Sequence, residues 1–298
     1  MALATTERKV AVYTLDPAAG EGFTRRLALE GHEDWVRGLD WTLFPASASP
    51  SSDADDTAGE AGAQDLMLAS ASQDGYIRLW RVSRVAASPA DPTPAAVAAA
   101  AAAADGPEEL NDAMLDAFER RMTGDAAGAT SRSATQLSTK AQMMDLADGT
   151  WGISLEALLI GHEGWVTAVR WSPRAVSPGS PRLLSTSADN SMIVWAPEAQ
   201  SSVWLAQHRF GEMNARSVGL FGALWCLGAP VGEGKREVDV VANAWNGGFQ
   251  RWRAVVDCRE AGAQVQEAWE AKWAPTGHGL GVKDLAWDPA REYLVSVR

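Results

Sequence analysis

The chain has 298 residues, 46% of them hydrophobic, and a formal net charge of −12 at pH 7. That length can bury a substantial core, whereas the acidity argues against a basic surface for direct nucleic-acid binding. The N-terminus lacks the apolar stretch of a secretory signal, and the longest apolar run, residues 95–104, is too short to span a bilayer, so we expect no membrane association.

The first predicted element is a strand at residues 8–15, where Val, Tyr and Leu are interleaved with smaller and polar residues. It precedes the pair Gly31-His32, with which the first full repeat of the chain begins. We therefore assign residues 1–30 to the end of a preceding repeat unit.

A repeated motif organises the rest of the chain. Gly31-His32-Glu33-Asp34-Trp35-Val36 returns as Gly161-His162-Glu163-Gly164-Trp165-Val166, and a third pair stands at Gly277-His278. In the first two copies a Ser, an Asp and a Trp follow, with four positions from Ser to Asp and six from Asp to Trp: Ser70, Asp74 and Trp80, then Ser185, Asp189 and Trp195. Gly-His and a terminal Trp at such spacing are typical of WD-repeat β-propeller blades.

Two units are complete by this criterion, residues 31–85 and residues 151–205. In the first, a strand that ends at Ser72 runs into a Gln-Asp-Gly turn and returns antiparallel from Tyr76 to Trp80. The Asp-Gly pair suits a tight hairpin because Gly accepts positive φ without steric cost.

A degenerate unit covers residues 206–256. Alignment with the intact units places Ala242 at the Ser position and Asn246 at the Asp position, while Trp252 keeps the indole. We expect its inner strand at residues 220–227. A unit of this kind depends on the sheets that stack against both of its faces.

The last unit, residues 277–298, begins with His278 and reaches Ser296 at the Ser position. The total is an all-β fold of about three and a half WD-repeat blades, fewer than the four to eight of a closed propeller. We therefore expect an incomplete propeller, a piece of a longer protein.

Two insertions interrupt the units and carry much of the acidity. Residues 46–64 are rich in Ala, Ser and Asp, and residues 85–150 contain a poly-Ala tract, so both are predicted to be disordered. Within the second, residues 107–122 are a candidate helix, with acids in the first turn, Arg in the last and an apolar face. Such a helix could dock a partner or pack on its own propeller.

The resemblance to the WD-repeat family implies a buried hydrogen-bonded tetrad in each intact blade. In that family the imidazole lies between the carboxylate and the hydroxyl, and the hydroxyl receives the indole N–H. Carried over by position, the tetrads are His32, Ser70, Asp74 and Trp80, then His162, Ser185, Asp189 and Trp195, with His278 and Trp252 as parts of incomplete ones. A Ser, a His and an Asp could also suggest a hydrolase triad, but two copies of the set favour a structural network.

A closer resemblance is to the family of the Elongator complex's second subunit. It rests on Gly31–Trp41, Leu68–Trp80, Leu184–Pro197, Val203–Leu205 and Gly281–Pro289. The Trp-Ala-Pro that ends the third segment, followed by Val-Trp-Leu, is unusual among WD repeats and similar to this subunit. The Trp-Asp pair that names the WD class is absent, because each blade Trp precedes Arg or Ala.

That resemblance implies a non-catalytic scaffold in a complex that modifies wobble uridines of tRNA. Its partners would be the largest and the catalytic Elongator subunits, and its location cytoplasmic and also nuclear, in transcription-linked acetylation. It implies no cofactor, no metal and no small-molecule substrate. Two alternatives remain: a generic WD-repeat adaptor of another complex, and an enzyme with His208 as its base.

Overall fold

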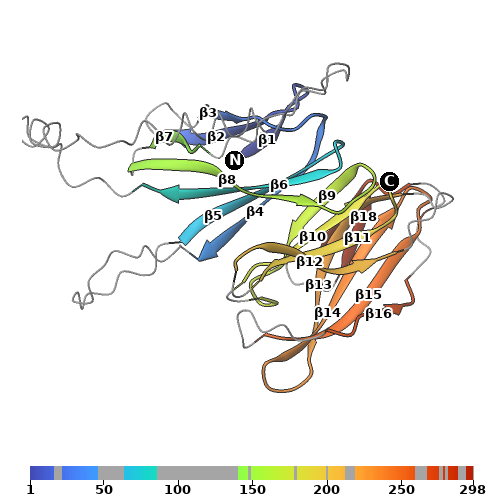
Figure 1. Cartoon of the computed structure of the whole chain (residues 1–298). Coiled ribbons are helices and arrows are strands. Elements are labelled where there is room, and N and C mark those ends of the chain that lie inside the picture. The colour runs from blue at the N-terminus through green and yellow to red at the C-terminus, as the bar shows by residue number, and fades with distance from the viewer. Residues whose placement is uncertain are drawn as a thin grey trace, which may run out of the picture. The chain divides into compact units, whose positions relative to one another are not determined.

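A computed structural model describes residues 1–16, 22–45, 64–85, 140–146, 149–177, 180–198, 201–211, 219–258, 267–274, 278, 281–287 and 293–297. These residues form antiparallel β-sheets and no helix (Figure 1). The expectation of an all-β fold of WD-repeat propeller sheets is confirmed. The first insertion as far as residue 63, most of the second and the candidate helix 107–122 lie outside the described residues.

Sheet A contains the strand expected near the N-terminus. Its strands, in spatial order, are β1 (Ala2–Ala4), β2 (Val10–Asp16) and β3 (Gly22–Leu29). Val10 and Val12 of β2 are buried because they pack in an apolar cluster with residues of the next sheet.

Sheet B is the first complete sheet, and it contains more of the chain than predicted. Its strands, in spatial order, are β4 (Val36–Pro45), β5 (Gln64–Ser72), β6 (Tyr76–Arg84), β8 (Gly149–Ile160) and β7 (Gln142–Leu146). Residues 142–146 and 149–150 are therefore strand rather than insertion, and residues 151–160 belong to this sheet rather than to the next blade. The reason is that β8 pairs with β6 along nearly its whole length, from Tyr76↔Ile160 to Arg84↔Trp151.

Three further sheets follow. Sheet C consists of β9 (Val166–Trp171), β10 (Leu183–Ser187), β11 (Met192–Pro197) and β12 (Trp204–Phe210). Sheet D consists of β13 (Leu220–Pro230), β14 (Lys235–Ala244), β15 (Phe249–Asp257) and β16 (Glu270–Lys272). Sheet E is the pair β17 (Asp284–Trp287) and β18 (Leu294–Val297). The expected inner strand of the degenerate unit lies within β13, and the last strand of sheet C extends to Phe210, beyond the predicted limit of residue 205.

Strand register shows that these sheets are repeats of one another. The Trp near the end of the first strand pairs with an apolar residue two positions before the Ser position: Trp41↔Leu68, Trp171↔Leu183, Trp225↔Val240 and Trp287↔Leu294. In sheets B, C and D the same apolar residue pairs on its other side with the blade Trp: Leu68↔Trp80, Leu183↔Trp195 and Val240↔Trp252. The degenerate unit therefore keeps the register of the intact ones.

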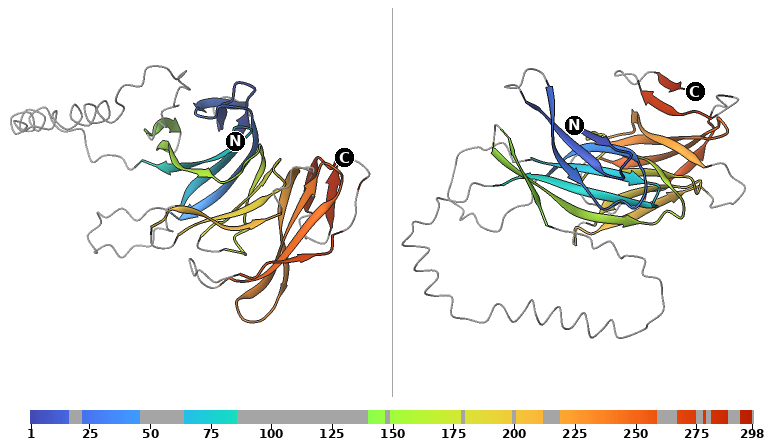
Figure 2. Two further views of the ribbon diagram at one scale, coloured as in Figure 1. Left: turned by 45° about the vertical axis from the view of Figure 1, so that its right-hand side comes forward. Right: turned by 90° about the horizontal axis from the view of Figure 1, so that it is seen from above.

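Successive sheets bury both faces of their middle strands. One apolar cluster joins sheets A and B, a second joins B and C, and a third joins C and D (Figure 2, where C is yellow and D is orange). In the third cluster Phe210 of sheet C packs against Trp252 of sheet D, with ring centroids 5.3 Å apart. Burial on both faces explains why β5 and β6 are nearly continuous runs of buried residues instead of alternating ones.

Indole hydrogen bonds also join neighbouring sheets. Trp171 Nε1 donates to the main-chain oxygen of Asp40 at 3.1 Å, and Trp225 Nε1 donates to that of Arg170 at 3.0 Å. The Asp40 carboxylate in addition accepts the main-chain N–H of Trp171 at 2.7 Å. Burial raises the pKa of Asp40, and this bond partly opposes that effect. Each first strand is thus tied to the first strand of the preceding sheet.

Replacing Gly38 by Ala is expected to lower the free energy of unfolding by about 1–3 kcal/mol, because overpacked interiors are destabilised by such amounts. The added Cβ would lie 3.0 Å from Ala168 Cα and 3.1 Å from Val169 N, main-chain atoms of the next sheet. Gly152→Ala is the matched control, because its Cβ would meet side chains at 3.5 Å or more. Urea denaturation measures both, and an equal effect of the two variants would contradict this packing.

Candidate functional site

The conserved spacing of the motif brings four side chains together in sheet B. His32 lies between the last strand of sheet A and the first strand of sheet B. Its Nδ1 is 2.8 Å from Asp74 Oδ2, its Nε2 is 2.8 Å from Ser70 Oγ, and Trp80 Nε1 donates to the same Oγ at 3.0 Å. All four side chains come from the positions chosen from the sequence.

The second tetrad has the same connections in sheet C. His162 Nδ1 lies 3.2 Å from Asp189 Oδ2, and its Nε2 lies 2.8 Å from Ser185 Oγ, which also accepts the N–H of Trp195 at 2.8 Å. Both His–Asp distances fall within the range of roughly 2.7–3.2 Å expected for such hydrogen bonds. Sheets B and C therefore contain the same buried chain of hydrogen bonds, which links the Gly-His loop to the hairpin of the sheet.

The chain of hydrogen bonds fixes where the protons are. A carboxylate only accepts, so the imidazole N–H of His32 is on Nδ1 and points to Asp74. Arg78 Nη1, which lies 2.7 Å from the same Nδ1, therefore donates to the Asp74 carboxylate and not to the ring. Nε2 then accepts the Ser70 O–H, while the Ser70 oxygen accepts the Trp80 N–H. Every polar atom of this buried chain has a partner, as burial requires.

The two aspartates also shape the turns above the tetrads. Asp74 accepts the main-chain N–H groups of Tyr76 at 2.9 Å and Glu33 at 3.0 Å, so it holds both the hairpin and the Gly-His loop. Burial alone would raise the pKa of Asp74, but these bonds and the one from His32 lower it to about 2. Asp189 makes the equivalent bonds in sheet C, and its pKa is likewise lowered.

Arg78 is a member of the first site that sequence reasoning missed. Its side chain is buried in the middle of β6, where Nη1 donates to Asp74 at 3.1 Å and Nη2 to the main-chain oxygen of Gly31 at 2.6 Å. Burial lowers the pKa of His32, the bond to Asp74 opposes this, and the Arg78 charge adds to the lowering, so the imidazole is held neutral. The sequence feature that could have pointed to Arg78 is its charge within the otherwise apolar run Tyr76–Trp80.

The incomplete sets are only partly assembled. His278 Nε2 lies 2.8 Å from Ser296 Oγ, which matches the predicted Ser position of the last unit. In sheet D, Asn246 keeps the turn by accepting the N–H of Gly248 at 2.9 Å. Trp252 is half-buried and packs against Phe210, with ring centroids 5.3 Å apart.

The tetrads have the same order of hydrogen bonds as a hydrolase triad, but their serine hydroxyls are buried. The order Asp–His–Ser is the same, but Ser70 and Ser185 are 0% exposed, and each hydroxyl oxygen is already bonded to an indole. A nucleophile must reach a substrate carbon. These side chains therefore hold the blades together.

His208 belongs to a separate cluster between sheets C and D. Its Nε2 lies 3.7 Å from the buried carboxylate of Glu267, which is also bonded to Arg182 at 2.5 Å and to Trp269 Nε1 at 3.2 Å. Burial lowers the pKa of His208, and the Glu267 charge opposes that effect. Sequence reasoning missed Glu267, because nothing in the repeat pattern marks it as a buried acid. The cluster joins two sheets, and no group of three or more potential metal ligands occurs among the described residues.

Comparison with known proteins agrees with the repeats. The family model "WD domain, G-beta repeat" matches residues 23–81 and 154–196, which include all eight residues of the two tetrads. Elongator complex protein 2 of mouse is 30% identical over 283 residues, which are 92% of this chain and 25% of the relative. The proteins of that name from Drosophila melanogaster and Arabidopsis thaliana are 30% and 27% identical, over 93% and 100% of this chain.

Along 92–100% of its length, the chain is similar to proteins named Elongator complex protein 2. The resemblance named from the sequence is confirmed. The chain spans 25–29% of the length of the relatives that it matches. None of the described residues lies in a helix that is long and apolar enough to cross a membrane.

Asp189→Ala is expected to lower the free energy of unfolding by about 1–3 kcal/mol. The change would leave the imidazole N–H of His162 and the main-chain N–H of Glu163 without an acceptor. Asn246→Ala is the matched variant in the degenerate sheet, where a turn bond to Gly248 would be lost, so its effect should be smaller. Urea denaturation of both variants measures the difference, and a larger loss for Asn246→Ala would contradict the assigned roles.

Acid should remove the stabilisation that Asp74 provides. Its folded-state pKa of about 2 is below the ordinary value near 3.9, so its contribution is present above about pH 4 and is lost as the pH falls toward 2. The difference in unfolding free energy between the wild type and Asp74→Asn should therefore shrink over that interval. Denaturation curves at pH 2 to 6 measure it, and a difference independent of pH would contradict the bonding described for this carboxylate.

Proposed function

We propose that this protein is a non-catalytic scaffold subunit of Elongator, which organises other subunits for the modification of wobble uridines in tRNA. The observation that carries the proposal is the match of 92–100% of the chain to proteins named Elongator complex protein 2, combined with the WD repeats. WD-repeat sheets are rigid stacks whose loops are free to bind other chains. Burial of both serine hydroxyls supports a binding role over a hydrolytic one.

The proposed partners are the largest and the catalytic Elongator subunits. The subunit would hold the catalytic one in the assembly and would act in the cytoplasm, and in the nucleus where transcription-linked acetylation is involved. Its effect on tRNA would be indirect, through the catalytic subunit. No cofactor or small-molecule substrate is part of this proposal.

Immunoprecipitation of the endogenous protein tests the assignment. An antibody raised against residues 105–139, which lie outside the described residues, should recover the largest and the catalytic Elongator subunits, identified by mass spectrometry. Cells in which the gene is deleted are the control, and their tRNA should lose Elongator-dependent wobble modification. Recovery of a different set of partners, with unchanged tRNA, would identify an adaptor of another complex.

A further inference from the structure

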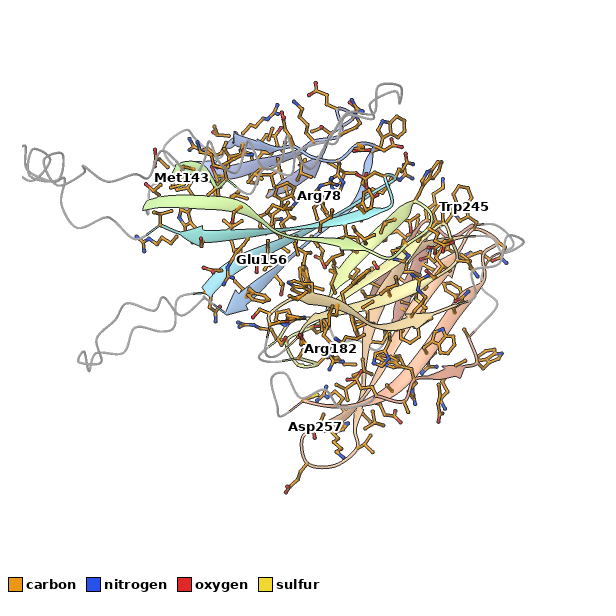
Figure 3. The ribbon with its side chains drawn as sticks, viewed as in Figure 1. Arg78, Met143, Glu156, Arg182, Trp245 and Asp257 are labelled. Carbon is orange, nitrogen blue, oxygen red and sulfur yellow. The ribbon has the colours of Figure 1, made fainter. Side chains whose placement is uncertain are left out.

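Three tryptophan side chains are half exposed at the same ends of three consecutive sheets. Trp35, Trp165 and Trp245 are 53%, 51% and 48% exposed. Trp35 and Trp165 occupy the same position of the repeated motif, directly before β4 and β9. Trp245 lies at the β14–β15 turn, at the opposite end of sheet D from Asp257 (Figure 3).

The same main-chain hydrogen bond places all three residues. The oxygens of Trp35 and Trp165 accept N–H groups from the turn of their own sheet, Gln73 and Ala188, each at 2.9 Å. In sheet D the equivalent bond runs from Trp245 N–H to the oxygen of Gly219 at 3.2 Å. A main-chain bond can be made by any residue, so this bond does not explain why these positions carry indoles.

The loops that carry the indoles form a continuous surface. A Cβ added at Gly75 would meet the main-chain oxygen of Gly164 at 3.7 Å, and one at Gly219 would lie 2.6 Å from Ala188 Cα. The turn of each sheet therefore lies against the loop that begins the next. Beyond Gly219, the Trp245 ring stacks on Phe221 with centroids 4.2 Å apart. The indoles are thus presented on a preformed, closely packed support.

Carboxylates accompany the indoles. On loops 31–37 and 161–165 the acids are Glu33, Asp34 and Glu163 and the base is Arg37, whereas Asp74 and Asp189 of the neighbouring turns are buried in the tetrads. Two arginines reach the loops from strands, where Arg78 and Arg209 donate to the main-chain oxygens of Gly31 and Gly161. Arg8 donates to the main-chain oxygen of Glu33 at 3.1 Å. Exposed Glu33 and Glu163 each stand two residues before an exposed Trp.

Indoles beside carboxylates match one kind of ligand. A Lys or Arg side chain gains from the face of a Trp ring and from a nearby carboxylate together. Trp is also enriched among the residues that dominate binding energy in protein interfaces. A row of such positions along neighbouring loops suits an extended peptide better than a compact surface.

We propose that the surface formed by Trp35, Trp165 and Trp245 with Glu163 docks an extended, lysine- and arginine-bearing segment of another polypeptide. This deepens the scaffold function proposed above and rests on it, because it names where another chain would bind. The basic side chains lie over the indoles, and one of them pairs with the Glu163 carboxylate.

Binding of a fluorescein-labelled (Arg-Gly)4 peptide to the full chain tests this surface, with (Glu-Gly)4 as the negative probe. At physiological salt, Trp165→Ala should raise the Kd measured by fluorescence anisotropy about fivefold, the effect expected for loss of one cation–π contact. Trp273→Ala is the matched control, since Trp273 is 80% exposed and lies outside these loops, and its Kd should stay within about twofold of the wild type. Circular dichroism should show that both variants fold.

The carboxylate is tested in the same way. Glu163→Gln should weaken binding, whereas Glu270→Gln, an exposed acid paired with Lys272, should not. Absence of (Arg-Gly)4 binding, or equal loss in the Trp165 and Trp273 variants, would overturn the docking surface. The Trp165→Ala protein is also immunoprecipitated: if Elongator subunits still co-precipitate while (Arg-Gly)4 does not bind even the wild type, this surface is wrong and the scaffold function stands.

Discussion

The rest of this structure depends on a buried imidazole that must be hydrogen-bonded at both ring nitrogens. His32 and His162 lie in the connections between sheets, where burial without partners would be costly. Their partners are a hydroxyl and a carboxylate on the hairpin of the following sheet. Each connection is thus hydrogen-bonded to the hairpin of the following sheet. The indoles of Trp80 and Trp195, on the second strand of that hairpin, donate the last hydrogen bond, to the serine hydroxyl.

This constraint extends from the core to the surface. The aspartates that bind the imidazoles also accept main-chain N–H groups from the Gly-His loops, so the exposed ends of the sheets have a fixed shape. Between sheets, apolar packing is reinforced by Trp171 and Trp225, whose indoles donate to the preceding sheet. A stack fixed in this way can present loop side chains without rearranging, which lowers the cost of binding another chain.

The sequence was sufficient for features that depend on local spacing. Ser70, Asp74 and Trp80 belong to one hairpin, so their repeated intervals located them in the sequence, and the resemblance to WD repeats implied that they lie together. The outer strand β8 was assigned to the wrong sheet because the long insertion before it interrupts the repeat. Only its pairing with β6 shows that it belongs to sheet B. Arg78, Asp40 and Glu267 act through contacts between distant segments, and such contacts leave no periodic signal.

The most direct test of this account is the tautomer of the buried histidines. The chain has four histidines, so their side-chain ¹⁵N resonances can be assigned by substitution. A long-range ¹H–¹⁵N spectrum should show the ring proton of His32 and of His162 on Nδ1, facing Asp74 and Asp189. Rings protonated at Nε2, or averaging between tautomers as exposed histidines do, would contradict the buried hydrogen-bond chain on which the fold is explained.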